Sequence, residues 1–294
     1  LRPSVTGPIA IGDDAALWQP EHETFEVLTT DALVEDIHFR LSTSSWRALG
    51  WKALAENISD IAAMGALPTR AFITLGLRPG TRVADLEDLY HGMADLQAHL
   101  LETGGYDPAI AGGDIVSSPT TFLSITVVGE LHGPGLRRAA GKPGDLVAVT
   151  GALGGSAGGL ALLEAADARR GTPDAETLIA LHQGPEPRVG EGLTLAEAGI
   201  LCGMDLSDGL LGDLGKLAYA SRLTATIRAD QVPLPPALER MFPGEAISMA
   251  VRGGEDYELL VAGPADRIAE ASRLLAEREL MPLKVIGVLT EGTP

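Results

Sequence analysis

Short acidic motifs recur along the whole chain, and most of them follow an apolar, strand-like run or stand beside glycine. The six motifs are Asp13-Asp14, Thr29-Thr30-Asp31, Asp60, Gly112-Gly113-Asp114, Asp205-Leu206-Ser207-Asp208 and Gly253-Gly254-Glu255-Asp256. Backbone at such positions can hold a carboxylate at the mouth of a cleft. Carboxylates that share one site raise each other's pKa unless cations lie between them. Because oxygen ligands favour Mg²⁺, which usually accompanies a phosphate-bearing substrate, the motifs predict phosphate chemistry.

The charge balance of the chain narrows the classes of partner. There are 40 Asp and Glu residues against 22 Lys and Arg, a formal net charge of -18. Binding to nucleic acid needs patches of Lys and Arg, so we expect no nucleic-acid partner. No apolar run approaches the roughly 20 residues that span a bilayer, and the chain opens without a signal-peptide pattern. We therefore expect a cytoplasmic enzyme with no membrane partner.

Several familiar sites are absent from the sequence. The single cysteine, Cys202, excludes an intramolecular disulfide framework and a multi-cysteine zinc site, and its apolar neighbours indicate a buried structural thiol. There is no phosphate loop of the Gly-x-x-x-x-Gly-Lys-Ser/Thr type, no Gly-x-Gly-x-x-Gly dinucleotide motif and no protein-kinase signature. If the protein uses ATP, another architecture binds it.

Residue patterns predict strands and helices in both halves. In the first half, strands are expected at 25–30, 71–77, 109–111 and 122–130. Helices are expected from Ser44 or Ser45 to Met64 and along the stripe from Leu86 to Leu100, the second of them ending at Gly104-Gly105. In the second half, strands are expected at 146–150, 257–262 and 284–289, and helices at 154–166, 176–183, 189–198 and 266–279. The first strand should end at Asp31 and the short strand should end before Gly112.

The turn residues Gly133-Pro134-Gly135 resemble a linker between two domains. The sequence therefore predicts a two-domain protein of the α+β or α/β class. Residues 1–134 would form an N-terminal sheet-and-helix domain, and residues 135–294 a C-terminal α/β domain.

Each motif also has a simpler interpretation when it is taken alone. Asp13-Asp14 fits an Asx-turn, Asp60 a solvated helix face, and Ser207 a helix N-cap. A lone histidine such as His38 is more often structural than functional. Arg138, in a rare basic pair, fits either a bidentate phosphate contact or a solvated linker charge.

Three of the motifs point more strongly to a ligand. Thr29-Thr30-Asp31 places three hard oxygens at the end of a strand, although a strand end before a helix cap explains them equally well. The two glycines before Asp114 let the backbone approach a ligand. Gly253-Gly254 followed by two acids before an apolar strand is a specific arrangement, although surface turns with this composition exist.

Together the motifs resemble the thiamine-monophosphate kinase family, part of the superfamily that includes aminoimidazole ribonucleotide synthetase. The resemblance covers nearly the whole chain and rests on Ile11–Leu17, Thr29–Phe39, Lys52–Ala66, Gly112–Asp114, Gly141–Thr150, Asp205–Leu214 and Gly253–Leu260. In this family ATP donates its γ-phosphoryl group directly to thiamine monophosphate, which gives thiamine diphosphate and ADP. The resemblance also implies a homodimer in which the N-terminal domains pair through their sheets.

The resemblance implies a role for each matching residue. The magnesium ligands, for several Mg²⁺ ions, would be Asp14, Thr29, Thr30, Asp31, Asp60, Asp114, Asp205 and Asp208. The ATP contacts would be Gly113, Asp114, Arg138 and Ser207, and the contacts to thiamine monophosphate would be His38 and Glu255. Chains of this family usually end with an aromatic residue that packs on thiamine. This sequence stops before that segment, so we expect an incomplete thiamine pocket.

Two other functions stay open at this point. One is a different ATP-dependent reaction of the same superfamily, on a purine-pathway amide or on selenide. The selenide enzyme would carry a reactive Cys or selenocysteine near its N-terminus, and the purine enzymes lack the pattern of residues 29–39. The other is a non-catalytic module that binds nucleotide or metal, in which some of the acidic ligands would usually be lost.

Overall fold

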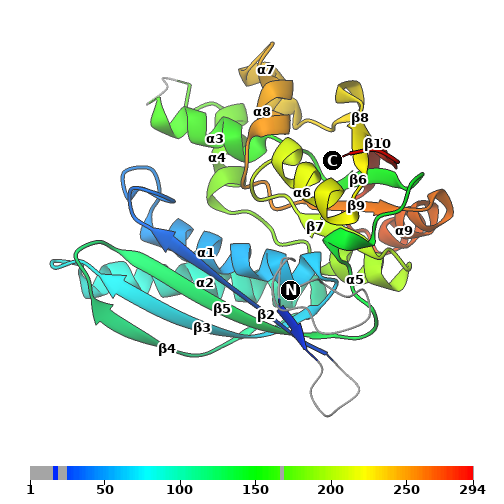
Figure 1. Ribbon diagram of the computed structural model, residues 1–294. Coiled ribbons are helices and arrows are strands. Elements are labelled where there is room, and N and C mark those ends of the chain that lie inside the picture. Colours follow the sequence, from blue (N-terminus) through cyan, green and yellow to red (C-terminus); the bar gives the residue numbers. More distant parts are fainter. Residues whose placement is uncertain (1–15, 19–24, 166–168, 294) are drawn as a thin grey trace.

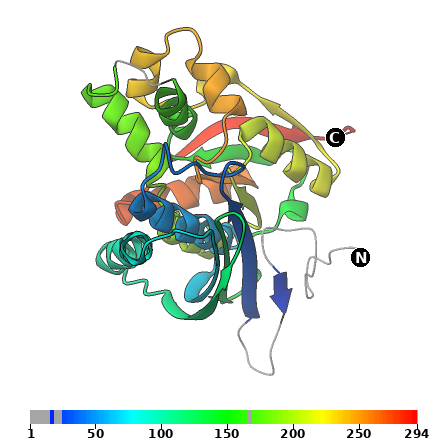
Figure 2. The ribbon, with the colours of Figure 1, turned by 90° about the vertical axis from the view of Figure 1, so that its left-hand side faces the viewer.

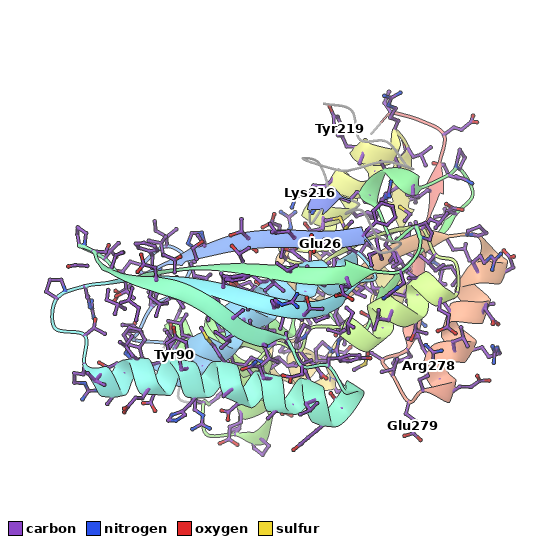
Figure 3. All side chains as sticks on the ribbon, turned by 90° about the horizontal axis from the view of Figure 1, so that it is seen from below. Glu26, Tyr90, Lys216, Tyr219, Arg278 and Glu279 are labelled. Atoms are coloured by element: carbon purple, nitrogen blue, oxygen red, sulfur yellow. The ribbon has the colours of Figure 1, made fainter. Side chains whose placement is uncertain are left out.

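The computed structural model describes residues 16–18, 25–165 and 169–293, and each half of the chain forms a sheet with helices packed on it (Figure 1). The strands of the first half are β1 (Ala16–Trp18), β2 (Phe25–Val34), β3 (Leu67–Leu77), β4 (Ala109–Ser117) and β5 (Phe122–Leu131). Their order across the sheet is β1-β2-β5-β3-β4, in which only the pair β3 and β4 is parallel. The long helices α1 (Trp46–Ala63) and α2 (Val83–Gly104) cover one face of this sheet (Figure 2). The helix α2 carries Tyr90 and runs along the sheet in Figure 3.

The second half has a sheet in the order β7-β9-β6-β10-β8, and all its described pairs are antiparallel. Its strands are β6 (Leu146–Thr150), β7 (Cys202–Asp205), β8 (Thr224–Ile227), β9 (Leu259–Gly263) and β10 (Leu283–Thr290). Its helices are α3 (Gly155–Glu164), α4 (Pro173–Gln183), α5 (Val189–Glu197), α6 (Leu210–Ser221), α7 (Pro236–Met241), α8 (Ala246–Arg252) and α9 (Ala265–Glu277). Short 3₁₀ turns lie at Arg138–Ala140 (η1) and Ala229–Gln231 (η2). The predicted mixture of helices and sheets in two parts is confirmed.

Two strands of the first half continue several residues past the ends that the sequence predicts. β2 does not end at Asp31 but continues to Val34, because β5 pairs with every residue of β2 from Phe25 onward. β4 likewise runs through Gly112 and Asp114 to Ser117, in register with β3. Pairing with a neighbouring strand outweighs the weak local strand preference of glycine and aspartate. The acidic motifs 29–31 and 112–114 therefore lie within strands.

The helix α1 occupies the centre of the molecule. Ser45 caps its start by accepting a hydrogen bond from the Ala48 amide, as the sequence predicts. Three polar residues of this helix, Glu56, Asn57 and Ser59, are nevertheless buried. The reason is tertiary: the first sheet and α2 pack on one side of α1, and β7, α4 and α5 of the second half pack on the other (Figures 1 and 2).

The two long helices approach each other so closely that Gly92 has no room for a side chain. A Cβ atom at this position would lie 1.8 Å from the carbonyl oxygen of Arg47. We therefore expect Gly92→Ala to lower the free energy of unfolding by about 1–3 kcal/mol, because the helices must move apart. Gly215 of α6 is the matched control, since nothing lies within 4 Å of its Cβ position. Gly215→Ala should raise the free energy of unfolding by about 0.5–1 kcal/mol.

Urea denaturation of both variants measures these changes. A Gly92→Ala protein as stable as the wild type would contradict the packing of α1 on α2.

Among the helices in the described ranges, none has the length and hydropathy of a bilayer-spanning segment.

Candidate active site

The helix α1 holds β2 through two direct hydrogen bonds, one to a side chain and one to the backbone. Thr29 Oγ1 donates to Asp60 Oδ2 over 2.5 Å, and the Asp31 amide donates to Asn57 Oδ1 over 3.1 Å. Thr29 and Asp31 are two residues apart, so both lie on the face of β2 that is turned toward α1. The register of the sheet agrees, because Asp31 stands opposite the buried Ile125 of β5.

The second half of the chain adds a carboxylate to the same turn of α1. Asp205, at the end of β7, is only 2% exposed, and its Oδ2 accepts a hydrogen bond from Ser59 Oγ at 2.8 Å. Asp205 therefore meets the helix one residue from Asp60. We refer to Thr29, Asp31, Asp60 and Asp205 as the oxygen cluster.

The oxygen cluster has the donor chemistry that magnesium requires. Its carboxylate and hydroxyl oxygens are hard ligands, and Mg²⁺ is typically held by one or two carboxylates together with water and substrate phosphates. Within the described ranges, no group of three or more His, Cys, Asp and Glu side chains is placed to hold a metal ion. Asp14, the remaining predicted ligand near the N-terminus, lies outside the described residues. The residues present fit a metal that shares its coordination with a substrate phosphate.

Two acidic motifs of the second half lie side by side through backbone hydrogen bonds. The Glu255 amide donates to the Ser207 carbonyl over 2.8 Å, and the Tyr257 amide donates to the Leu206 carbonyl over 3.0 Å. A Cβ atom on Gly254 would lie 2.4 Å from the Ser207 carbonyl oxygen, so this close contact requires glycine. Glu255 is thereby fixed next to the turn that follows Asp205.

Asp208 points away from the buried part of this turn. Its side chain is mostly exposed and forms an ion pair with Lys216 of α6, which is labelled in Figure 3. Lys216 also pairs with the buried Asp213, whose pKa is raised by its burial. The N-cap of α6 is Gly209, so the alternative role of Ser207 as the helix cap is wrong.

A pocket of about 510 Å³ opens where the two halves meet. The segment after β2 and the start of α1 form one wall, and α3, α4 and residues 253–255 form the other. Both residues predicted to contact the substrate, His38 and Glu255, line it. His38 is exposed, and its Nδ1 accepts a hydrogen bond from the Val34 amide at 3.1 Å.

Glu255 is held by basic side chains from two helices. Lys52 Nζ of α1 lies 2.9 Å from Glu255 Oε2, and His182 Nδ1 of α4 lies 3.5 Å from the same oxygen. The ring of His182 also contacts Ser156 Oγ at 2.9 Å. Burial, together with the nearby charge of Lys52, lowers the pKa of His182 to about 4. His182 is therefore neutral at pH 7, and Lys52 supplies the positive charge beside Glu255.

The residues that follow Glu255 are anchored inside the second half. Asp256 accepts hydrogen bonds from the Gly154 and Ser156 amides at the start of α3, and burial raises its pKa to about 7. Glu258 forms a bidentate ion pair with Arg188, at 2.6 and 2.9 Å. These contacts give Asp256 and Glu258 a structural role, while Glu255 faces the pocket.

Three predicted residues of the first sheet lie away from the oxygen cluster. Thr30, between Thr29 and Asp31, faces the other side of the sheet, where Thr126 Oγ1 donates to its hydroxyl over 3.0 Å. Asp114 also faces that side, because it is in register with Thr74, Ser124 and Ala32. Gly113 and Asp114 belong to β4, three strands from β2, which corresponds to about 14 Å. A single chain does not bring them to Asp31.

Arg138, the last of the predicted ATP contacts, belongs to η1. Its carbonyl oxygen accepts a hydrogen bond from Ser221 Oγ of α6 at 2.7 Å and lies beside the buried Cys202. The prediction that Cys202 is a buried thiol is confirmed.

The structure also adds residues that the motifs did not identify. Lys52, Asn57 and Ser59 of α1 hold the site together, and Glu56 lies among them with a pKa that burial raises to about 7. The sequence feature that could have identified these residues is the run of polar residues inside an otherwise apolar helix. His182 had no signal, because only the packing of α4 brings it to Glu255.

The chain matches known proteins along nearly its whole length. The family "AIR synthase related protein" matches twice, with its N-terminal domain over residues 12–131 and its C-terminal domain over residues 142–293. The thiamine-monophosphate kinase of Bacillus subtilis is 37% identical over 85% of this chain and 76% of its own length. The enzyme of Escherichia coli K12 is 40% identical, over 87% of this chain and 76% of its own length.

Solved structures show the same similarity. The structure of AaThiL complexed with AMPPCP and TMP superposes with a TM-score of 0.84 at 32% identity, over 96% of this chain and 86% of that chain. The thiamine-monophosphate kinase of Stenotrophomonas maltophilia gives a TM-score of 0.85 at 36% identity, over 97% and 89%. The hydrogenase maturation protein HypE, at 19% identity and a TM-score of 0.70, shares the fold.

Proposed function

The chain belongs to the thiamine-monophosphate kinase family of AIR synthase related proteins, and on that basis we propose that it transfers the γ-phosphoryl group of ATP to thiamine monophosphate. One observation carries the proposal. The oxygen cluster and the 510 Å³ pocket meet at a single junction, where the Glu255 amide binds the Ser207 carbonyl. This junction offers adjoining places for phosphate groups and for an organic ring system. The solved relative that holds AMPPCP, an ATP analogue, together with TMP supports this pairing.

The proposed reaction is a direct in-line transfer. An oxygen of thiamine monophosphate attacks the γ-phosphorus of ATP, a new P–O bond forms while the bond to the β,γ-bridging oxygen breaks, and ADP leaves. The attacking phosphate oxygen is already ionised at neutral pH, so no side chain has to become phosphorylated. The protein contributes by holding both anions in line. Mg²⁺, when bound, neutralises phosphate charge in this reaction.

Side chains from both halves of the chain would bind the metal ions and the two substrates. Thr29, Asp31, Asp60 and Asp205 would hold Mg²⁺, and the family resemblance adds Asp14, Thr30, Asp114 and Asp208 as further ligands. Gly113, Asp114, Arg138 and Ser207 would contact ATP, and His38 and Glu255 would contact thiamine monophosphate.

We also propose that the enzyme is a homodimer and that each site is shared between the two chains. Asp31 and Asp114 lie about 14 Å apart on opposite faces of the same sheet. Both can serve one triphosphate only if the second chain supplies one of them. β4 is the exposed edge of that sheet, and Ile115 beside Asp114 is 54% exposed. An exposed edge strand with apolar side chains is suited to pairing with a second copy.

Subunit mixing tests the shared site. Asp31→Asn and Asp114→Asn should each be inactive alone. After the two variants are unfolded together and refolded, about half of the dimers contain one chain of each kind, and each of these has one intact site. We therefore expect about a quarter of the wild-type activity per chain. A mixture as inactive as its two components would contradict a site built from Asp31 of one chain and Asp114 of the other.

A coupled assay of ADP release tests the activity itself. We expect ADP release to depend on both thiamine monophosphate and Mg²⁺, and to stop when EDTA removes the metal. ADP release that ignores thiamine monophosphate would favour another reaction of the superfamily. Nucleotide binding without any ADP release would favour a non-catalytic module.

A further inference from the structure

The carboxylate of Glu255 is held at only one of its two oxygens. Lys52 Nζ approaches Oε2 at 2.9 Å and His182 Nδ1 approaches the same atom at 3.5 Å. Within the described part of the chain, Oε1 has no hydrogen-bond partner. The side chain of Glu255 is 30% exposed and lines the pocket, whereas that of Lys52 is 8% exposed. One oxygen is therefore tied to the protein and the other is left for a ligand.

The backbone of this segment is strained in a way that fixes the direction of the carboxylate. Glu255 and Tyr257 have backbone φ angles of +66° and +51°, which residues other than glycine rarely adopt. Such strain persists only where the surroundings hold it, and it is concentrated at ligand sites. Here Asp256 is bound by the start of α3, and the Glu255 amide is bound by Ser207. The side chain of Glu255 therefore extends from a backbone segment that hydrogen bonds hold in place.

Lys52 is the only one of the two basic contacts that carries a positive charge at neutral pH, because the buried His182 is neutral. An ammonium group next to a carboxylate forms a charge-assisted hydrogen bond, which fixes the position of the oxygen that it contacts. Lys52 belongs to α1, the helix that also bears Asp60 of the oxygen cluster. The same helix therefore sets the positions of both the pocket carboxylate and the phosphate side of the site.

We propose that Lys52 is a positioning residue, which holds Oε2 of Glu255 and so orients the carboxylate that its Oε1 accepts a hydrogen bond from an N–H donor of the substrate ring system. This inference rests on the proposed function, which assigns thiamine monophosphate to the pocket. The aminopyrimidine ring of thiamine carries such a donor in its exocyclic amino group. Lys52 itself does not touch the substrate, and it acts through Glu255.

The test compares Lys52→Met, Glu255→Gln and the double variant by steady-state kinetics. Each single change should raise the KM for thiamine monophosphate by about tenfold or more, because a charge-assisted hydrogen bond is lost. The KM for ATP and kcat should change far less. The double variant should be no worse than Glu255→Gln alone, since both changes remove the same contact. Lys52→Arg should recover most of the affinity.

Controls separate this inference from a folding defect and from the proposed function. Lys284→Met makes the same change on the exposed surface of β10 and should behave as the wild type. If Lys52→Met does not fold, Lys52→Gln provides a second neutral variant. Independent, additive losses in the double variant would overturn the role of Lys52, as would a KM for ATP that rises in parallel. A wild-type enzyme whose turnover ignores thiamine monophosphate would instead refute the proposed function.

Discussion

Replacing Asp205 by asparagine is expected to lower kcat/KM by about 10²–10³-fold, which is typical for the loss of a charge that stabilises a transition state. Asp205 is the carboxylate that the second half of the chain contributes to the oxygen cluster. An asparagine side chain has nearly the same shape, and its oxygen can still accept the hydrogen bond from Ser59. The change therefore removes one negative charge and leaves the packing of β7 on α1 in place.

The same variant should be at least as stable as the wild type. Asp205 is only 2% exposed, so replacing its carboxylate by a neutral amide removes the cost of burying a charge. Asp145→Asn is the matched control. This aspartate is also buried, and it accepts a hydrogen bond from the Lys142 amide in a turn outside the site. An Asp205→Asn enzyme with near-normal kcat/KM, or one that unfolds, would contradict this account of the cluster.

Replacing Arg188 by methionine is expected to cause a large loss of stability, about 3–5 kcal/mol in the free energy of unfolding. Arg188 and Glu258 form a bidentate pair with side chains that are 11% and 5% exposed. Without the guanidinium, the carboxylate of Glu258 would stay buried with Thr150 as its remaining hydrogen-bond donor among the described contacts. A buried charge without its counterion is costly.

A second change in the same pair tests this explanation. Glu258→Gln removes the charge but keeps an oxygen that can accept the hydrogen bond from Thr150. The double variant Arg188→Met with Glu258→Gln should therefore be clearly more stable than Arg188→Met alone. Arg273→Met, which breaks an exposed pair with Glu270, should change stability little. Urea denaturation of the wild type, Arg188→Met, the double variant and Arg273→Met measures these changes, and a double variant that is less stable than Arg188→Met would refute the explanation.

The sequence predicted the elements whose signals are local. The cap of α1 at Ser45 and the end of α2 at Gly104-Gly105 follow from side-chain hydrogen bonding and glycine conformation, and both are confirmed. Helices α7 and α8 and strand β8 were not predicted, because each is short and held mainly by packing against the second half. The full lengths of β2 and β4 depend on pairing with β5 and β3, which local composition does not encode.

The sequence offered a set of candidate residues but not their arrangement. The family that the motifs resemble implied Asp31, Asp60 and Asp205 as ligands, and the structure connects β2 and Asp205 to residues 57–60 of α1. It separates Asp114 from them, since strand order depends on long-range pairing. Lys52 and His182 emerged only when the helices that carry them were packed against Glu255.

Direct transfer from ATP to thiamine monophosphate is the central claim, and one labelling experiment tests it. The wild-type protein is incubated with Mg²⁺, thiamine monophosphate and ATP labelled with ³²P at the γ-position, and the products are separated. We predict that the label appears in thiamine diphosphate in step with ADP formation. Label found only in inorganic phosphate or on the protein, with no labelled thiamine diphosphate, would contradict the claim.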